Sequence, residues 1–404
     1  MKYYLTQIRS SGTQQEFNAV DVNDWLQIVY NGSPFDPDRS VANISNVHTK
    51  GYFSTITKCI DEALLIPRDV AKSIRLAETY LSRIETIIDT FNHQHNIQAR
   101  DYSSCYTTFS IPKASGGYRI ISAPNEALKI AHTEIAQILY YKFNLLYHDC
   151  CFSYFPHRCA KDALLVHQTF DSHWFLKADL KDFFPNTTKE FIINQLNKLL
   201  PIAEMGIVRG TLLDRVLEKL VDFCLLNGGL PQGAPLSPMI TNLIMIPIDY
   251  ELNKKFNSMR MRYTRYADDI LVSSRVKATP TSITNIIQEV LTNQNAPYII
   301  NSDKTRYGSR AGANWNLGLM LNKDNNITVG HKRKQQIKAG VYNMLRDFSN
   351  GVRWNYEQTT ALLGSIAYMR SVEGDYTDYM IRRIERQLHT DFHSTVKQLL
   401  NNRV

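Results

Sequence analysis

The chain has 404 residues, of which 44% are hydrophobic, so it can bury a sizeable interior, and its length favours two or three subdomains. An excess of 46 Lys+Arg over 38 Asp+Glu gives a net charge of +8, which suits a polyanionic partner but is also common in proteins that are merely soluble. No stretch approaches the roughly 20 apolar residues of a membrane span, and the first residues lack the apolar core of a secretory signal. These features argue against a membrane protein and predict a cytoplasmic one.

The predicted elements of the first half include helices and a hairpin. Apolar residues three and four positions apart predict an amphipathic helix over 68–92. Aromatic and β-branched runs on both sides of KASGG predict a hairpin over 106–124, with Lys113 and Arg119 near its tip. The next helix is predicted to begin with Asn125 as its N-cap.

The second half mixes strands and helices before a helical tail. Its predicted elements are a buried strand over 174–179, helices from about 188, over 212–226 and over 237–257, a hairpin over 261–274, a helix over 281–293, a hairpin turning at 323–325, and further helices. This order predicts an α+β fold. Because no GxGxxG or GxxxxGK turn is present, dinucleotide-binding and P-loop functions are excluded.

The basic excess concentrates at the C-terminal end. Residues 330–404 hold 12 Lys+Arg against 7 Asp+Glu, which accounts for five of the eight net positive charges. This part is therefore the first candidate for a surface that contacts a phosphate backbone. The alternative is that these charges lie on the solvated faces of ordinary helices.

The six cysteines show no Cys-x-x-Cys spacing, so free thiols are expected. One segment, HDCCFSYFPHRC over 148–159, collects three cysteines and two histidines. It has enough ligands for zinc but lacks the usual pair of two-residue spacers, and adjacent cysteines do not easily face one ion. A buried, aromatic-rich turn is favoured over a zinc site.

Two adjacent carboxylates, Asp268 and Asp269, stand at the turn of the hairpin predicted over 261–274. Each charge raises the cost of ionising the other, so the pair is either a polar hairpin tip or part of a metal site. Asp179 closes the predicted strand over 174–179. Carboxylates that converge from neighbouring strand ends suit Mg²⁺, which combines one or two of them with water and phosphate oxygens.

Two such ions about 3.5–4 Å apart would support nucleotidyl transfer, the chemistry of a polymerase. That reaction also needs cations on the triphosphate, and Lys113 and Arg119 have a suitable type and separation. Each feature alone is weak, because an ADD triplet or a basic hairpin tip often occurs by chance. Their occurrence together favours the polymerase hypothesis.

Four segments resemble the reverse transcriptase family. YADD at 266–269, LKADLKDFFPN at 176–186 and LPQGAPLSPMITNLI at 230–244 look like three palm motifs in the family's order. IPKASGGYRIISAP at 111–124 resembles the fingers motif of retrons, group II introns and other bacterial members. The resemblance covers roughly residues 105–345.

This resemblance implies a right-hand polymerase with an antiparallel palm sheet. The implied parts are a mostly helical N-terminal extension over 1–100, fingers over 101–170, a palm over 171–330 with inserted fingers helices at about 188–230, and a basic helical thumb over 331–404.

The resemblance also implies roles for individual residues. The catalytic and metal-binding set is Asp179, Asp268 and Asp269, with the backbone carbonyl of Leu180, on two Mg²⁺ ions for which Mn²⁺ is a possible substitute. The dNTP-binding set is Lys113, Arg119, Phe184, Gln232, Gly233 and Lys304. The primer and template set is Tyr266, Asn316, Gly318, Lys332 and Arg333.

Two of these assignments have ordinary alternatives. Phe184 lies five residues after Asp179, where the family carries an aromatic steric gate that excludes a 2′-hydroxyl; otherwise it is a core residue beside Phe183. Lys304 in INSDKT resembles the lysine near the pyrophosphate that acts as a general acid; otherwise it is a solvated loop residue.

Within the family, two departures argue against a true retron enzyme. KDALLVHQ has Asp162 where retrons carry Asn and places His167 one position late, and Asn316-Leu317-Gly318 replaces Val-Thr-Gly. Since no maturase or endonuclease region follows the thumb, the resemblance favours a compact bacterial defence-associated reverse transcriptase that works with a structured non-coding RNA.

The expected function is RNA-directed DNA synthesis, with an RNA template, dNTPs and a DNA product. Two alternatives are a catalytically idle nucleic-acid-binding relative, which would not need the intact triad, and an RNA-directed RNA polymerase, which Phe184 argues against. The sequence leaves open the template, the primer, the defence subtype, the role of residues 1–100 and homo-oligomer formation.

Overall fold

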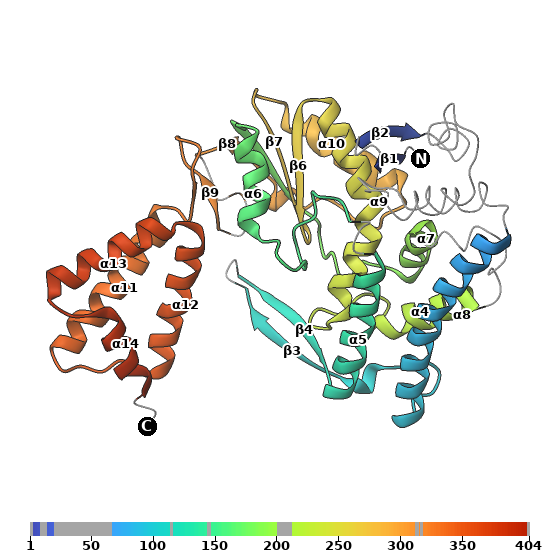
Figure 1. The fold of residues 1–404 in the computed structure, drawn as a ribbon, viewed down its shortest axis with the longest axis horizontal. Coiled ribbons are helices and arrows are strands. Elements are labelled where there is room, and N and C mark those ends of the chain that lie inside the picture. The colour runs from blue at the N-terminus through green and yellow to red at the C-terminus, as the bar shows by residue number, and fades with distance from the viewer. Residues whose placement is uncertain are drawn as a thin grey trace. The chain divides into compact units, whose positions relative to one another are not determined.

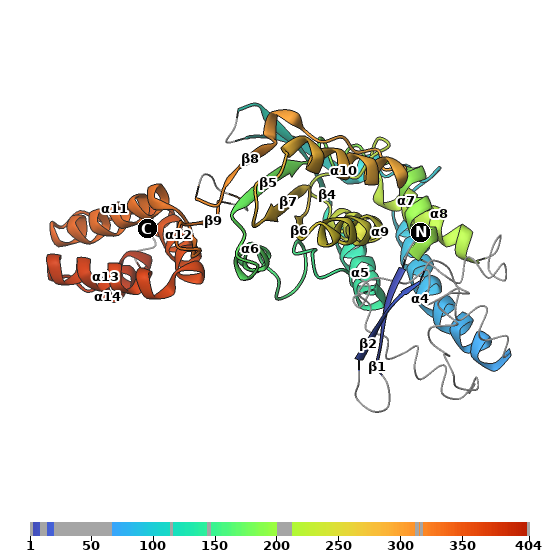
Figure 2. The same cartoon turned by 90° about the horizontal axis from the view of Figure 1, so that it is seen from above.

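The computed structural model describes residues 3–8, 14–19, 67–113, 116–143, 147–199, 212–311, 315 and 318–401. The chain divides into two compact units by its internal contacts. The first comprises Met1–His157, Ala178–Ile270 and Thr279–Thr305, and the second comprises Arg158–Lys177, Leu271–Ala278 and Arg306–Val404. Most of their helices and strands are labelled in Figure 1, and β5 is labelled in Figure 2.

The α+β prediction is confirmed, and the main predicted elements are present. The helices are α4 (Pro67–Gln94), α5 (Glu126–Phe143), α6 (Ala160–Thr169), α7 (Lys189–Leu199), α8 (Leu212–Cys224), α9 (Leu236–Ser258), α10 (Pro280–Asn293), α11 (His331–Ser349), α12 (Tyr356–Val372), α13 (Gly374–Leu388) and α14 (Phe392–Asn401). The strands are β1 (Tyr3–Ile8), β2 (Gln14–Ala19), β3 (Tyr106–Pro112), β4 (Tyr118–Pro124), β5 (Trp174–Asp179), β6 (Met261–Tyr266), β7 (Asp269–Ser274), β8 (Arg306–Ser309), β9 (Met320–Leu321) and β10 (Ile327–Thr328).

The strands form one four-stranded sheet and three two-stranded sheets. The larger sheet has the order β6-β7-β5-β8, so the β6–β7 hairpin lies beside the strand that ends at Asp179. The smaller sheets pair β1 with β2, β3 with β4 and β9 with β10. The β1–β2 pair falls in the N-terminal extension that was predicted to be mostly helical, in a stretch containing the β-favouring residues Tyr, Thr, Ile and Phe.

Helix α9 is the central helix of the first unit. It is buried around most of its circumference and packs against β6, α5, α7 and α10. Figure 2 views α9 nearly along its axis, with β6 beside it. A helix that is apolar on nearly all sides belongs in an interior, which explains the long apolar run predicted over 237–257.

The β3–β4 hairpin and the start of α5 have the geometry that their residues predict. Ile111 pairs with Arg119 in the antiparallel register, and the Lys113 N–H donates to the Gly117 carbonyl at 2.9 Å. The Leu128 N–H donates to Asn125 Oδ1 at 2.9 Å, so the predicted N-cap is confirmed.

The segment rich in cysteine and histidine is buried over Cys150–Ser153 in the first unit, whereas Tyr154, His157 and Cys159 are exposed and Cys159 belongs to the second unit. His148 Nδ1 accepts from the Cys150 N–H at 3.0 Å, and its Nε2 hydrogen-bonds to Asn253 at 2.9 Å. Cys151 is fully buried against Arg265 and Asn242. The five cysteines in the described part of the chain are free thiols, and Cys59 lies outside it.

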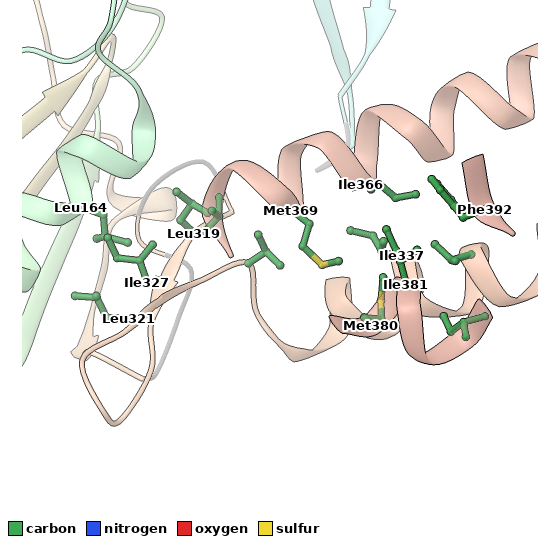
Figure 3. Close-up of a cluster of buried hydrophobic side chains, with 14 of the residues drawn as sticks. Leu164, Leu319, Leu321, Ile327, Ile337, Ile366, Met369, Met380, Ile381 and Phe392 are labelled. Carbon is green, nitrogen blue, oxygen red and sulfur yellow. The ribbon is translucent and has the colours of Figure 1, made fainter. Parts of the chain in front are cut away.

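The second unit has its own hydrophobic core. Phe175 stacks on Trp315 at 5.1 Å between ring centroids, and both are almost fully buried. Figure 3 shows apolar side chains of helices α11 to α14 gathered between those helices. The amphipathic helices predicted for the tail therefore bury their apolar faces against one another. Among the described residues, no helix has the length and apolar character needed to span a bilayer.

Candidate active site

The fold brings the three predicted carboxylates to one end of neighbouring strands. Asp179 is the last residue of β5, Asp268 lies in the β6–β7 turn, and Asp269 is the first residue of β7. The Leu180 N–H donates to the Asp268 carbonyl at 3.1 Å, which ties the end of β5 to that turn. This arrangement has two causes. Asp268 and Asp269 are adjacent in the chain, and β7 lies next to β5 in the sheet.

The environment of Asp268 disfavours the charged form of its carboxyl group. The pKa of the Asp268 carboxyl is raised to about 6 by burial and then by the charges of Asp269 and, to a lesser degree, Asp179. A raised carboxylate pKa records the free-energy cost of ionising the group, here mainly because it is buried and secondly because other carboxylates lie close to it. A bound divalent cation would remove that cost.

The donor set fits such a cation. Among the described residues, no hydrogen bond is made to the Leu180 carbonyl, while its N–H is used and its side chain is buried. Carboxylate and carbonyl oxygens are the ligands that Mg²⁺ prefers. Among the described residues, the histidine, cysteine and acidic side chains form no group of three or more that is arranged to hold a metal ion.

Lys304 lies at Asp179. Its Nζ contacts the two carboxylate oxygens at 3.2 and 3.0 Å, and Asn301 Nδ2 is 3.4 Å from one of them. The Asn301 N–H also donates to the Asp179 carbonyl at 2.8 Å. The loop predicted to contact the pyrophosphate thus supplies a cation to the first carboxylate of the triad.

We expect a Lys304→Met variant to bind Mn²⁺ more tightly in the absence of nucleotide. The Lys304 side chain is 57% exposed, so its pairing with Asp179 contributes only about 0–1 kcal/mol, and removing it should tighten binding by up to roughly fivefold. Electron paramagnetic resonance of free Mn²⁺ measures this affinity. Lys181→Met, which removes an exposed lysine near the same strand end, is the control; equal tightening in both variants would show a general charge effect.

The hairpin that carries Lys113 and Arg119 is bonded to the Gln232–Gly233 loop. The Ser122 N–H of β4 donates to the Gln232 carbonyl at 2.8 Å. Lys113 and Arg119, the two basic residues predicted to bind the triphosphate, are both exposed, so a ligand from solution can reach them. Four predicted nucleotide contacts therefore lie on two directly bonded segments.

Gly233 adopts a φ of +117°, and a Cβ there would lie 3.0 Å from Ile121 Cγ2 and 3.1 Å from the Ser122 carbonyl oxygen. We expect Gly233→Ala to destabilise the fold by about 1–3 kcal/mol and to raise the KM for dNTP, because it separates the loop from β4. Chemical denaturation and steady-state kinetics measure these effects. Gly228→Ala is the control, since Gly228 also has positive φ but has open space around it; an equal effect there would leave only backbone strain as the cause.

Tyr154 is a neighbour of the site that sequence reasoning missed. Tyr154 is 46% exposed as a whole, but burial around its hydroxyl raises the pKa of that group, as does the charge of Asp268, while Arg119 acts in the opposite direction. Asp268 and Arg119 are therefore both close enough to act on this side chain. The residue lies in the segment considered for zinc, where no catalytic pattern marks it.

Phe184 and Phe183 occupy different environments. Phe183 is 2% exposed and packs on Tyr298 with ring centroids 4.8 Å apart, whereas Phe184 is only half-buried. The Phe184 carbonyl accepts from the N–H groups of Thr187 and Leu230 at 3.1 and 3.0 Å. The backbone of the predicted gate is thus fixed to the start of the Pro-Gln-Gly loop, while its ring keeps an accessible face.

The predicted primer and template residues are divided between the two units. Tyr266 is half-buried at the end of β6 in the first unit. In the second unit, the Arg333 guanidinium stacks 4.3 Å over the Tyr368 ring, close to Gly318, and Lys332 is exposed. Asn316 lies outside the described residues.

Comparison with known proteins gives a family match over the same region. Residues 111–339 match the family described as "Reverse transcriptase (RNA-dependent DNA polymerase)". The chain is 28% identical over 307 residues to the retron Ec83 reverse transcriptase of Escherichia coli, covering 73% of this chain and 89% of that protein. It is 26% identical over 289 residues to the retron Ec73 reverse transcriptase of Escherichia coli, covering 69% and 87%. It is also 26% identical over 318 residues to the retron Mx65 reverse transcriptase of Myxococcus xanthus, covering 76% and 71%.

The family match covers more than half of the chain and includes the β3–β4 hairpin, all three carboxylates and the Gln232–Gly233 loop. The chain therefore belongs to the reverse transcriptase family of RNA-dependent DNA polymerases.

Proposed function

We propose that this RNA-directed DNA polymerase adds dNTPs to a primer by nucleotidyl transfer that depends on two Mg²⁺ ions, for which Mn²⁺ can substitute. The observation that carries the proposal is the convergence of Asp179, Asp268 and Asp269 at adjacent strand ends, with the pKa of Asp268 raised by burial and by the neighbouring carboxylates. Together with the Leu180 carbonyl, these oxygens would hold the ions. Bound ions would activate a primer 3′-hydroxyl and offset the charge of the leaving pyrophosphate.

The surrounding residues would bind and orient the nucleotide. Lys113 and Arg119 offer exposed cations for the triphosphate, on a strand bonded to Gln232. Lys304, which lies on Asp179 in the nucleotide-free protein, would move to the pyrophosphate and donate a proton to it. The half-buried Phe184 ring would lie under the sugar and exclude a 2′-hydroxyl.

The template in this proposal is a structured non-coding RNA, and the biological role is anti-phage defence in the bacterial cytoplasm. The similarity to bacterial retron reverse transcriptases supports a dedicated RNA partner. The surplus of basic residues over 330–404 supports contact with a nucleic-acid backbone. Phosphate and sugar contacts of this kind position a duplex without reading its sequence.

The test uses the purified full-length protein, an RNA template with an annealed primer, and labelled dNTPs or NTPs. We expect incorporation of dNTPs with Mg²⁺ or Mn²⁺, none with EDTA, and poor use of NTPs. Absence of incorporation under all metal conditions, or a preference for NTPs, would contradict the proposal.

The RNA partner and the defence role need a separate experiment. RNA bound to the protein in cells should be sequenced with and without phage infection, and survival should be compared with that of cells carrying an Asp268→Asn/Asp269→Asn variant. One enriched RNA species and protection that requires both carboxylates are expected. Protection that does not depend on the carboxylates would refute the catalytic basis of the role.

A further inference from the structure

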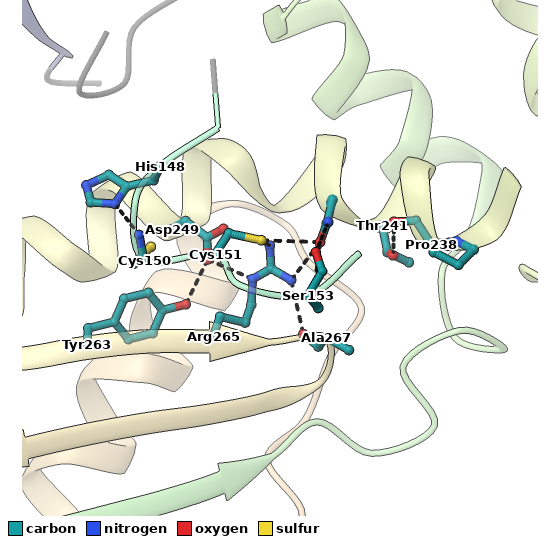
Figure 4. Close-up of polar contacts among 11 residues, drawn as sticks. His148, Cys150, Cys151, Ser153, Pro238, Thr241, Asp249, Tyr263, Arg265 and Ala267 are labelled. Carbon is teal, nitrogen blue, oxygen red and sulfur yellow. Dashed lines mark hydrogen bonds and ion pairs between the residues drawn. The ribbon is translucent and has the colours of Figure 1, made fainter. Parts of the chain in front are cut away.

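A fully buried ion pair, between Arg265 and Asp249, is hydrogen-bonded to the turn that carries Asp268 and Asp269. The side chain of Arg265 in β6 is 0% exposed, and that of Asp249 in α9 is 1% exposed. Arg265 Nε donates to Asp249 Oδ1 at 2.8 Å and Nη2 donates to Oδ2 at 2.8 Å, a bidentate pair. Figure 4 shows the Arg265 side chain extending from β6 toward Asp249.

The remaining guanidinium donors are also used inside the protein. Nη1 donates to the Ala267 carbonyl at 3.1 Å and to Asn242 Oδ1 at 3.2 Å, while Nη2 lies 3.1 Å from Cys151 Sγ. Tyr263 Oη donates to Asp249 Oδ1 at 2.8 Å. With its donors used in this way and no exposed surface, Arg265 is not placed to bind a nucleotide or nucleic acid directly.

The bond to Ala267 matters because this residue has an unusual backbone conformation. Its φ is +56°, in the left-handed region that residues with a Cβ rarely adopt. Asp268 and Asp269 follow immediately in the chain, so a rotation of the peptide at Ala267 would move both carboxylates. On its other side the turn is held by the Leu180 N–H on the Asp268 carbonyl.

Stability alone gives little reason for an ion pair in this position. Replacing a buried pair with apolar side chains of similar volume is often neutral or stabilising, because desolvating two charges is costly. An apolar pair would not supply the N–H that holds the Ala267 carbonyl. The polar network therefore supplies a fixed backbone geometry that apolar packing would not.

We propose that Arg265 is a positioning residue, which holds the β6–β7 turn through the Ala267 carbonyl and so sets the placement of Asp268 and Asp269 for metal binding and catalysis. Asp249 acts through Arg265 by fixing the guanidinium. This inference rests on the proposed function, and it assigns the support of the metal site to a buried pair that contacts neither metal nor substrate.

Two variants of the full-length protein test the proposal. Arg265→Lys keeps a cation beside Asp249 but has one terminal nitrogen, which cannot reproduce the bidentate pair and the bond to Ala267 together. The triple variant Tyr263→Phe/Asp249→Val/Arg265→Met replaces the pair with apolar groups and leaves no tyrosine hydroxyl without its acceptor. Tyr263→Phe alone is the matched control, because it keeps the Arg265 to Ala267 bond.

For both test variants we expect kcat to fall by roughly 10²-fold or more, while the KM for dNTP stays within about threefold. Mn²⁺ binding, measured by electron paramagnetic resonance without nucleotide, should weaken by about tenfold, as for other residues that orient metal ligands. The Tyr263→Phe control should match the wild type in both measurements.

Thermal unfolding of each variant shows whether its loss of kcat and of Mn²⁺ affinity is caused only by a less stable fold. A loss of activity that tracks the unfolded fraction, or a folded test variant with wild-type kcat and Mn²⁺ affinity, would overturn the proposal. An inactive wild type would contradict the proposed function instead, and the Mn²⁺ measurement would still decide the role of Arg265.

Discussion

An Asp268→Asn variant is expected to lose DNA synthesis by at least about 10³-fold, since a metal-binding carboxylate supports several kcal/mol of transition-state stabilisation. The same variant should be more stable than the wild type at pH 8 in EDTA. The pKa of Asp268 rises from an ordinary 3.8 to about 6 in the folded protein, because of burial and the neighbouring carboxylates. Each pKa unit corresponds to about 1.4 kcal/mol, and allowing for partial exposure we expect a gain of about 1–2 kcal/mol.

The sign of the pH dependence follows from the raised pKa. Ionised Asp268 lowers folding stability at high pH, and this cost fades as the pH falls through the folded-state pKa of about 6 toward the ordinary value of 3.8, below which the carboxyl is protonated in both states. The stability gain of Asp268→Asn should therefore shrink between pH 8 and pH 4 in denaturation curves. Asp303→Asn, at an exposed position in the Lys304 loop, is the control. An active Asp268→Asn variant, or one destabilised at pH 8, would contradict the assignment.

Local sequence patterns predicted the elements that carry the site. The β3–β4 hairpin follows from β-favouring runs around a glycine turn, and α5 begins at Asn125 because its side chain caps the first turn. Strand β5 ends at Asp179, where the apolar run ends. Each of these features is determined by residues that are close together in the sequence. A local sequence pattern is therefore enough to predict it.

The contacts that organise the site depend on residues far apart in the chain. Lys304 reaches Asp179 across 125 positions, and Arg265 reaches Asp249 in a different element. Charged residues are almost never fully buried unless paired, so periodicity alone gives no reason to expect Arg265 in the interior. The residues at alternate positions before it in β6, Met261 and Tyr263, are apolar or aromatic and also buried, and this pattern could have signalled an inward-facing arginine.

The first departure from the retron pattern, in the KDALLVHQ segment, has a local structural explanation. Asp162 accepts from the Cys159 N–H at 2.8 Å and so caps the start of α6. His167 is fully buried and hydrogen-bonds through Nδ1 to Ser273 at 2.5 Å. Both residues serve packing within the second unit, which is compatible with the chain's similarity to retron reverse transcriptases.

A Phe184→Ala variant is expected to lose discrimination between dNTPs and NTPs. Overlap of a 2′-hydroxyl with a fixed ring should cost about 1–3 kcal/mol, so removing the ring should raise relative NTP incorporation by roughly 10- to 100-fold. The half-buried Phe184 ring is free to contact a sugar, and its backbone is fixed by the Leu230 N–H. The ratio of kcat/KM for a dNTP to that for the matching NTP measures the effect.

The neighbouring phenylalanine provides the matched control for this experiment. Phe183→Leu removes part of a ring that is 2% exposed and packed on Tyr298, so it should lower the free energy of unfolding by about 1–3 kcal/mol. Its dNTP to NTP ratio should stay near that of the wild type, because its side chain points into the core. If Phe183→Leu relaxes sugar discrimination as much as Phe184→Ala does, the selectivity arises from general packing beneath the site, and Phe184 is not the gate.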